Sequence, residues 1–101
     1  MQDANARLEE LIAAAARAEA RVDEWSAAEF TGRADDGGIV AVTDALGALT
    51  RLDISPRTRR RLDATNLAAA ILQAISTAEE AATASRDALL TDLHPGPRQK
   101  P

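Results

Sequence analysis

Cysteine is missing from this sequence of 101 residues, and histidine occurs only once. The absence of cysteine excludes disulfide bonds, thiolate metal sites and cysteine nucleophiles together. The single histidine, His94, stands beside Pro95, whereas a metal site needs several converging ligands and a histidine base needs a positioned partner. We therefore interpret His94 as a solvated residue and expect neither a metal site nor a cofactor.

Long apolar runs are also absent, because none approaches the ~18 residues that a membrane-spanning helix needs. The first ten residues, MQDANARLEE, lack the basic region followed by an apolar stretch that marks a secretory signal. From both observations we expect a cytoplasmic protein without a membrane partner.

Groups able to perform catalysis are scarce. The carboxylate pairs Glu9-Glu10 and Glu79-Glu80 lie in stretches with a helical pattern, where adjacent residues do not face one another. Asp35-Asp36 precedes Gly37-Gly38, which is typical of a turn, and this glycine pair lacks the spacing and the lysine of a phosphate-binding loop. We predict that the protein is not an enzyme and has no catalytic residues.

Aromatic residues make up 2% of the chain, and much of the 46% hydrophobic fraction is alanine. Alanine removes little apolar area from water, so one copy has a thin core. The length favours one domain, and a domain of this size is only marginally stable alone. We therefore expect a homodimer whose second copy completes the core.

Residues 4–28 have the pattern of one long helix, which Asp3 would cap at its N-terminus. Its apolar residues recur at spacings of three and four, forming what we call the apolar stripe: Leu8, Leu11, Ala15, Ala18, Val22 and Trp25. The stripe fits packing against the chain's own sheet, contact with a partner copy, or a mixture, which we favour. Trp25 therefore has a core or interface role in preference to stacking on a base.

The middle third is typical of β-structure. Residues 29–34, 39–43 and 48–54 have strand character, and the turn-forming segments 35–38 and 44–47 separate them. Short turns between sequential strands favour an antiparallel meander, one face of which helices would cover. The last strand ends at Ser55-Pro56, since proline lacks the amide that pairing requires.

A basic connector at residues 57–62 leads to a second long helix at residues 64–90, with Asp63 as its N-cap. The proline-rich residues 93–101 are predicted to be a disordered tail, leaving residues 1–92 as the domain. The fold class is therefore α+β: a helix, a three-stranded antiparallel meander and a helix.

The net charge of −4 and the pI near 4.9 argue against a nucleic-acid partner when taken alone. The charge is uneven, however: residues 31–62 sum to +2, residues 1–30 to −4 and residues 63–101 to −2. The basic surplus is concentrated in residues 57–61, RTRRR. Such a cluster contacts phosphates in some proteins. In others it is a solvated connector or pairs with acidic residues of a partner, and this segment alone does not distinguish among the three roles.

The order of these elements, with specific segments, resembles the YbaB/EbfC family of nucleoid-associated DNA-binding proteins. The resemblance rests on residues 30–32 (FTG), 38–43 (GIVAVT), 49–56 (LTRLDISP) and 67–74 (LAAAILQA), in that order and spacing. Two segments depart from the family pattern, which usually has Asp-Pro where this chain has Ser55-Pro56 and a different turn at residues 44–47. The similar region covers about residues 5–90.

The resemblance implies a tweezers-like homodimer with paired sheets at its centre and helices as arms. It implies binding of double-stranded DNA with low or moderate sequence preference, in the nucleoid of the cytoplasm. Because the first helix is acidic and would repel the DNA backbone, we expect this binding to be weak and to have little sequence preference. We expect DNA contacts from the arginine cluster and one strand residue, namely Arg57, Arg59, Arg60, Arg61 and Arg51, and dimer contacts from Leu49, Val22 and Trp25. The alternative is a protein-interaction adaptor linked to a specialised secretion system, as some actinobacterial relatives of the family suggest.

Overall fold

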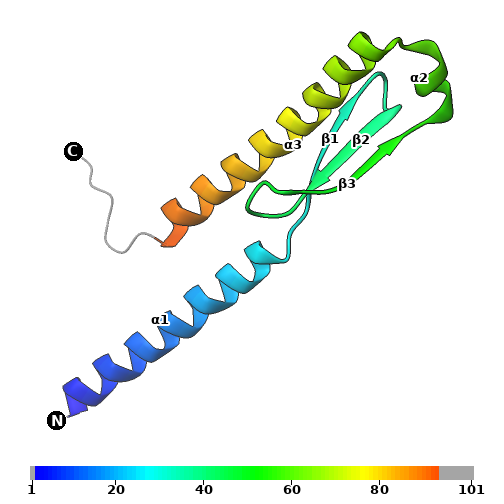
Figure 1. The fold of residues 1–101 in the computed structure, drawn as a ribbon. Coiled ribbons are helices and arrows are strands. Elements are labelled where there is room, and N and C mark those ends of the chain that lie inside the picture. The colour runs from blue at the N-terminus through cyan, green and yellow to red at the C-terminus, as the bar shows by residue number, and fades with distance from the viewer. Residues whose placement is uncertain (1, 94–101) are drawn as a thin grey trace, which may run out of the picture.

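The computed structural model describes residues 2–93, which form two long helices, a short helix and a three-stranded sheet (Figure 1). The elements are α1 (Gln2–Ser26), β1 (Phe30–Ala34), β2 (Ile39–Thr43), β3 (Leu49–Ile54), α2 (Pro56–Arg61) and α3 (Ala64–Leu93). The predicted α+β order is confirmed, and the basic connector is a helix of its own. Among these described residues, no helix combines the length and apolar character needed to cross a membrane.

The sheet is an antiparallel meander in the order β1-β2-β3, as the sequence predicts. At one end of the sheet Phe30 pairs with Thr43 and Thr43 with Leu49; at the other end Ala34 pairs with Ile39 and Ile39 with Ile54. The β2–β3 ladder contains a bulge between Val42 and Thr43. The register places the β2–β3 turn at the end of the sheet that α1 enters, and α2 at the opposite end (Figure 1).

The core lies between α3 and one face of the sheet. Ile39 and Ala41 of β2 are fully buried beneath Ala74 of α3, and apolar residues of β3 and α3 surround them. These partly buried residues are Leu52, Ile54, Leu67, Ala70, Ile71 and Ile75. α3 packs mainly against β1 and β2, so the opposite face of the sheet has no helix over it (Figure 1).

The closeness of α3 to the sheet depends on small residues. A Cβ atom at Gly32 of β1 would lie 2.0 Å from the carbonyl oxygen of Ala74 and 2.6 Å from the amide nitrogen of Ala78. Ala74 and Ala78 are themselves fully buried. Glycine on the strand and alanine on the helix therefore allow the two backbones to approach closely.

The observed helix ends agree only partly with the ends predicted from the sequence. Asp63 caps α3 as predicted, because its Oδ1 accepts a hydrogen bond from the Asn66 amide at 2.8 Å. The prediction that Asp3 is an N-cap is wrong: α1 begins at Gln2, so Asp3 lies within the first turn, where its charge still favours the helix dipole. α3 continues to Leu93, beyond the predicted end, while the remaining tail residues 94–101, including His94, lie outside the described residues.

The molecule is elongated, with extents of 73 × 31 × 17 Å, because α1 projects past the end of α3 (Figure 1). The main packing partner of α1 is α3, and not the sheet. Along the apolar stripe only Ala18 and Trp25 are partly covered, whereas Leu8 and Leu11 are exposed. The favoured mixture is therefore wrong in one part, since the covered residues of the stripe pack on α3 and not on the sheet. Most of the stripe is exposed, and its contact with a partner copy stays a prediction.

We expect Gly32→Ala to destabilise the fold by about 3 kcal/mol, the upper end of the usual cost of overpacking, because the new methyl group would push α3 away from β1. Urea denaturation followed by circular dichroism measures the change. Thr31→Ala, on the adjacent exposed residue, is the matched control and should lose much less. Equal loss in both variants would contradict the close-approach argument.

Candidate nucleic-acid interface

Helix α2 carries four of the five arginines expected to contact DNA, and local sequence explains why it forms. Ser55 is its N-cap: its Oγ accepts a hydrogen bond from the Thr58 amide at 3.1 Å. Pro56 follows at the start of the helix, where its missing amide costs nothing. The helix ends at Arg61, and the Leu62 amide donates to the Thr58 carbonyl oxygen.

A polar network fastens α2 to the β1–β2 turn. The Thr58 hydroxyl donates to Oδ2 of Asp35 at 2.6 Å, and the Arg61 guanidinium forms an ion pair with the same carboxylate. Asp35 has a φ of 52°, a left-handed conformation that aspartate tolerates in turns. The Ser55 amide also donates to the Gly38 carbonyl oxygen at 2.7 Å. The turn thus sets the position of α2 and of its arginines.

The same network favours the charged form of Asp35. The hydrogen bond from Thr58 and the adjacent guanidinium of Arg61 lower the pKa of the Asp35 carboxyl below its ordinary value, and they outweigh the opposing effect of desolvation. The Asp35 side chain is 14% exposed, whereas that of Arg61 is 54% exposed. Asp35 is therefore a negative charge held in place beside the arginine cluster.

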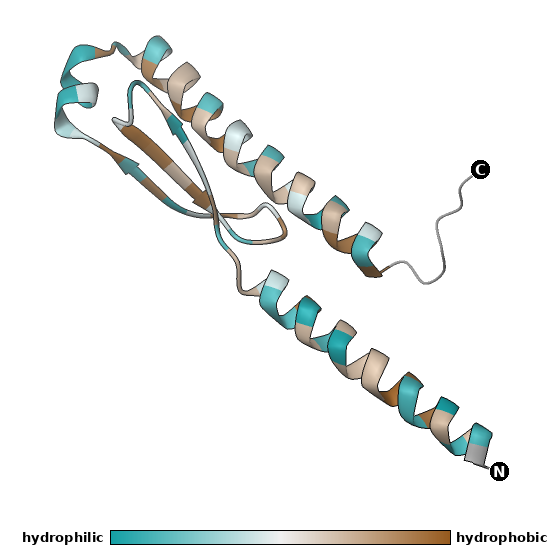
Figure 2. Cartoon of the chain, turned by 180° about the vertical axis from the view of Figure 1, so that it is seen from behind, coloured by the Kyte–Doolittle hydropathy of each residue, from teal (hydrophilic) through white to brown (hydrophobic). Residues whose placement is uncertain are grey.

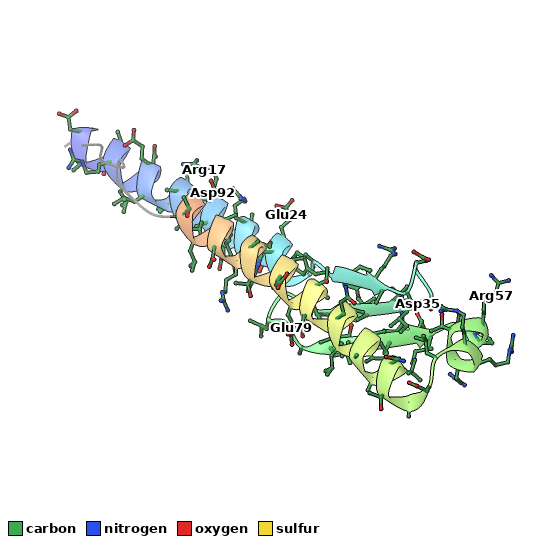
Figure 3. All side chains as sticks on the ribbon, turned by 90° about the horizontal axis from the view of Figure 1, so that it is seen from above. Arg17, Glu24, Asp35, Arg57, Glu79 and Asp92 are labelled. Atoms are coloured by element: carbon green, nitrogen blue, oxygen red, sulfur yellow. The ribbon has the colours of Figure 1, made fainter. Side chains whose placement is uncertain are left out.

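The five expected DNA-contacting arginines fall into two groups. Arg57, Arg59 and Arg60 are exposed and form no ion pair with any described residue. Arg61 is paired with Asp35, and Arg51 of β3 with Asp53 at 3.1 Å. Figure 3 labels Arg57 on α2 and Asp35 on the nearby turn. The structure thus gathers four arginines on one short helix and leaves Arg51 apart on the sheet.

One basic residue near α2 was not among the expected contacts. Arg33 of β1 is exposed and pairs in register with Val40, which pairs with Asp53. These three paired residues are one position from the end of the sheet where β3 leads into α2. Arg51 pairs with Val42, two positions farther from that end. Side chains alternate between the two faces of a strand, and the neighbours of Arg33, Gly32 and Ala34, are buried against α3. This alternation in the sequence could have predicted that Arg33 lies on the opposite face.

The expected dimer residues lie near the opposite end of the sheet. Leu49 is 45% exposed at the start of β3, and Val22 is 39% exposed on α1. Trp25 is half-buried near the end of α3, in a hollow shared with Ser85 and Leu89. Its indole N–H is buried and has no hydrogen-bond partner among residues 2–93. Leu49 and Val22 are therefore free for contact, whereas Trp25 is already partly used within the chain.

A hollow of about 400 Å³ lies between α2 and the β1–β2 turn, with both acidic and basic residues in its wall, including Asp36 and Arg57. Across residues 2–93, no group of three or more His, Cys, Asp or Glu side chains is placed to hold a metal ion. The most distinctive chemical feature is the exposed arginine cluster.

An exposed arginine helix on a small α+β scaffold is the kind of surface with which nucleic-acid-binding proteins contact phosphates. Comparison with family models identifies the scaffold: the model of the YbaB/EbfC DNA-binding family matches residues 1–96. The chain belongs to this family, whose members are nucleoid-associated DNA-binding proteins and not enzymes. No curated protein matches the sequence significantly.

The lowered pKa of Asp35 predicts a stability difference that depends on pH. The charged carboxylate stabilises the fold above the ordinary pKa of aspartate, and this contribution is lost as the pH falls through the lowered value. Asp35→Asn should therefore be less stable than wild type at pH 7, and the gap should shrink in acid. Urea titrations from pH 2 to 7 measure it.

Asp36→Asn is the control for this experiment, since it removes the neighbouring charge without touching Thr58 or Arg61. A gap between wild type and Asp35→Asn that stays constant over the whole pH range would show that the network does not hold α2 electrostatically.

Proposed function

We propose that this chain binds double-stranded DNA as a homodimer, through α2, weakly and with little preference for sequence. The observation that carries the proposal is the group of exposed and unpaired arginines on α2: Arg57, Arg59 and Arg60. Arginine suits this role because its planar guanidinium donates two hydrogen bonds to one phosphate. Arg61 adds to the positive electrostatic potential around α2. Arg51 and Arg33 also contact phosphates if the duplex extends over the sheet.

The geometry of α2 favours contact with the backbone over reading of bases. The helix has six residues, so at 1.5 Å per residue it is about 9 Å long. Recognition helices reach base edges by lying in the major groove, and they present several side chains along it. A single short helix with arginines around it suits phosphates, which carry no sequence information. We therefore infer low sequence preference.

The overall charge supports weak binding. The chain carries −4, and α1 contributes acids that repel the DNA backbone. Two copies offer ~8 cluster arginines, so the slope of log affinity against log salt should be no steeper than roughly −7. Asp35 neutralises part of Arg61, which makes the slope shallower still. We therefore infer weak binding at physiological salt, with the chain acting in the nucleoid.

The homodimer proposal rests on surfaces at the end of the sheet remote from α2. Leu49 and Val22 are exposed there, Trp25 lies close by on α1, and the sheet face opposite α3 is free. Burial of these residues between two copies would thicken a core in which most fully buried residues are small. Because α2 lies at the other end, the dimer would leave both arginine clusters accessible to one duplex.

A second candidate function is that of a protein-interaction adaptor that is linked to a specialised secretion system. One observation favours a protein partner: α1 exposes large apolar residues beyond the end of α3, such as Leu11 and Ile12. Such an adaptor would use the apolar stripe and would need no arginine cluster.

The triple variant Arg57→Gln/Arg59→Gln/Arg60→Gln should lower duplex affinity about tenfold or more at low salt, because up to six phosphate contacts per dimer are lost. The salt slope should also flatten by up to roughly 5. Fluorescence anisotropy with two unrelated duplexes at several salt concentrations measures both effects and the sequence preference.

The matched control is Arg7→Gln/Arg17→Gln/Arg86→Gln, which removes the same charge from exposed positions on α1 and α3. Equal losses in the two triple variants would move the interface away from α2. Wild-type protein that binds no duplex even at low salt would favour the adaptor.

The dimer proposal predicts that Leu49→Asp weakens self-association, since a carboxylate at the interface would have to be desolvated. Sedimentation equilibrium at micromolar concentration should show a lower mass for this variant than for wild type. Leu72→Asp, on the exposed surface of α3, should leave the mass unchanged. A wild-type protein that sediments as a folded monomer would contradict the proposal.

A further inference from the structure

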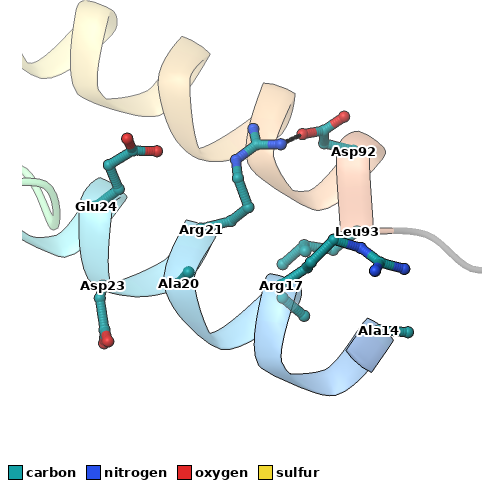
Figure 4. Close-up of a pocket in the computed structure, with 9 residues that line it drawn as sticks. Ala14, Arg17, Ala20, Arg21, Asp23, Glu24, Asp92 and Leu93 are labelled. Atoms are coloured by element: carbon teal, nitrogen blue, oxygen red, sulfur yellow. Dashed lines mark ion pairs between the residues drawn. The ribbon is translucent and has the colours of Figure 1, made fainter. Parts of the chain in front are cut away.

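The ion pair between Asp35 and Arg61 differs from the one that joins α1 to α3. Arg21 of α1 and Asp92 of α3 pair with both side chains about half exposed, at 50% and 44% (Figure 4). The Asp35 side chain is only 14% exposed, and its Oδ2 also accepts the hydrogen bond from the Thr58 hydroxyl. The carboxylate of Asp35 is therefore held in place by a residue other than Arg61.

A carboxylate that is already fixed forms a stronger ion pair than exposed carboxylates usually do. An exposed pair contributes little to stability because two long side chains must be ordered in one geometry. At Asp35 this cost falls mainly on Arg61, since Thr58 already holds the carboxylate. The lowered pKa of the Asp35 carboxyl, to which the Thr58 hydrogen bond contributes most, agrees with this interpretation.

Arg61 shares one face of α2 with Arg57. The two residues are four positions apart, a spacing that makes them neighbours on a helix, and both lie in the wall of the hollow beside the β1–β2 turn. Most of α2 is hydrophilic (Figure 2). Arg57 and Arg61 are thus placed to hold one phosphate group together, but the guanidinium of Arg61 already binds Asp35.

We propose that Asp35 is an internal competitor of DNA, which holds Arg61 and keeps its guanidinium from contacting phosphate. This inference rests on the proposed binding of double-stranded DNA through α2. The phosphate contacts of the helix then come from its three unpaired arginines. Asp35 lowers the affinity in two ways, because it withdraws one arginine and places a negative charge beside the surface that the DNA backbone approaches.

The competition favours Asp35 because the carboxylate and Arg61 belong to one chain. An intramolecular partner is present at a high effective concentration whether or not DNA is bound. The hollow itself does not attract a further anion, since the charges of Asp35 and Asp36 in its wall balance those of Arg57 and Arg61. A phosphate is attracted there only when the charge of Asp35 is removed.

Asp35→Asn tests the competition, because asparagine can still accept the Thr58 hydrogen bond but has no charge to hold Arg61. Duplex affinity should rise about threefold or more at low salt, since one more arginine contacts phosphate. The slope of log affinity against log salt should steepen by about 0.9 for each copy bound. Fluorescence anisotropy measures both quantities, and the double variant Asp35→Asn/Arg61→Gln should lose the steepening.

Asp36→Asn and Asp92→Asn are the matched controls, because each removes one negative charge. Asp36 lies in the same turn but forms no ion pair with Arg61, and Asp92→Asn frees Arg21 of α1 instead. Each control should raise the affinity by less than half as much as Asp35→Asn. Equal gains in Asp35→Asn and Asp36→Asn would overturn the competition, and so would a loss of affinity in Asp35→Asn.

A second comparison does not depend on the folding of Asp35→Asn. Arg57→Gln should flatten the salt slope by about 0.9 for each copy bound, and Arg61→Gln by less than half as much, because Asp35 holds Arg61 in the wild type. Equal flattening by these two variants would overturn the inference and leave the proposed function intact. Wild-type protein that binds no duplex at low salt would overturn both. Circular dichroism confirms that each variant is folded.

Discussion

The approach of α3 to β1 is the constraint on which the other parts of the molecule depend. Gly32 has no room for a side chain beneath Ala74 and Ala78, so helix and strand are held at a distance that only small residues permit. With so few large side chains in the core, stability comes from this closeness and from the length of the contact. The position of the sheet under α3 in turn fixes where the β1–β2 turn lies, and that turn holds α2.

Periodicity in the sequence predicted the order of the two long helices and the three strands, and it placed the strand boundaries to within one residue. The helix ends were less accurate, and the helical character of α2 was not predicted. The β-branched run of β2 and the Asp63 cap each reflect local chemistry, which is readable from neighbouring residues. The ion pair between Asp35 and Arg61 joins residues 26 positions apart, and such pairings follow only from the register of the sheet. Likewise, an amphipathic pattern indicated that α1 has an apolar face but could not indicate that α3 would cover only part of it.

The charges of the chain are separated along its length. The arginines of α2 stand at one end of the sheet, while the acids of α1 extend from the other end. The net charge of −4 is therefore not the local charge at either end of the molecule. A phosphate backbone would be attracted to α2 and repelled by α1. The composition alone argued against a nucleic-acid partner, and the spatial separation of charge removes that objection, since binding depends on the local field.

The bulge in the β2–β3 ladder has a consequence for the outer edge of the sheet. β3 is an edge strand, and an edge strand with free amide and carbonyl groups invites pairing with strands of other molecules. The bulge interrupts the regular spacing of those groups beside Thr50, whose hydroxyl donates to the Val42 carbonyl oxygen at 3.1 Å. The charged residues Arg51 and Asp53 follow directly. This edge is thereby protected against strand-by-strand aggregation, a hazard for a small protein whose core contains few large side chains.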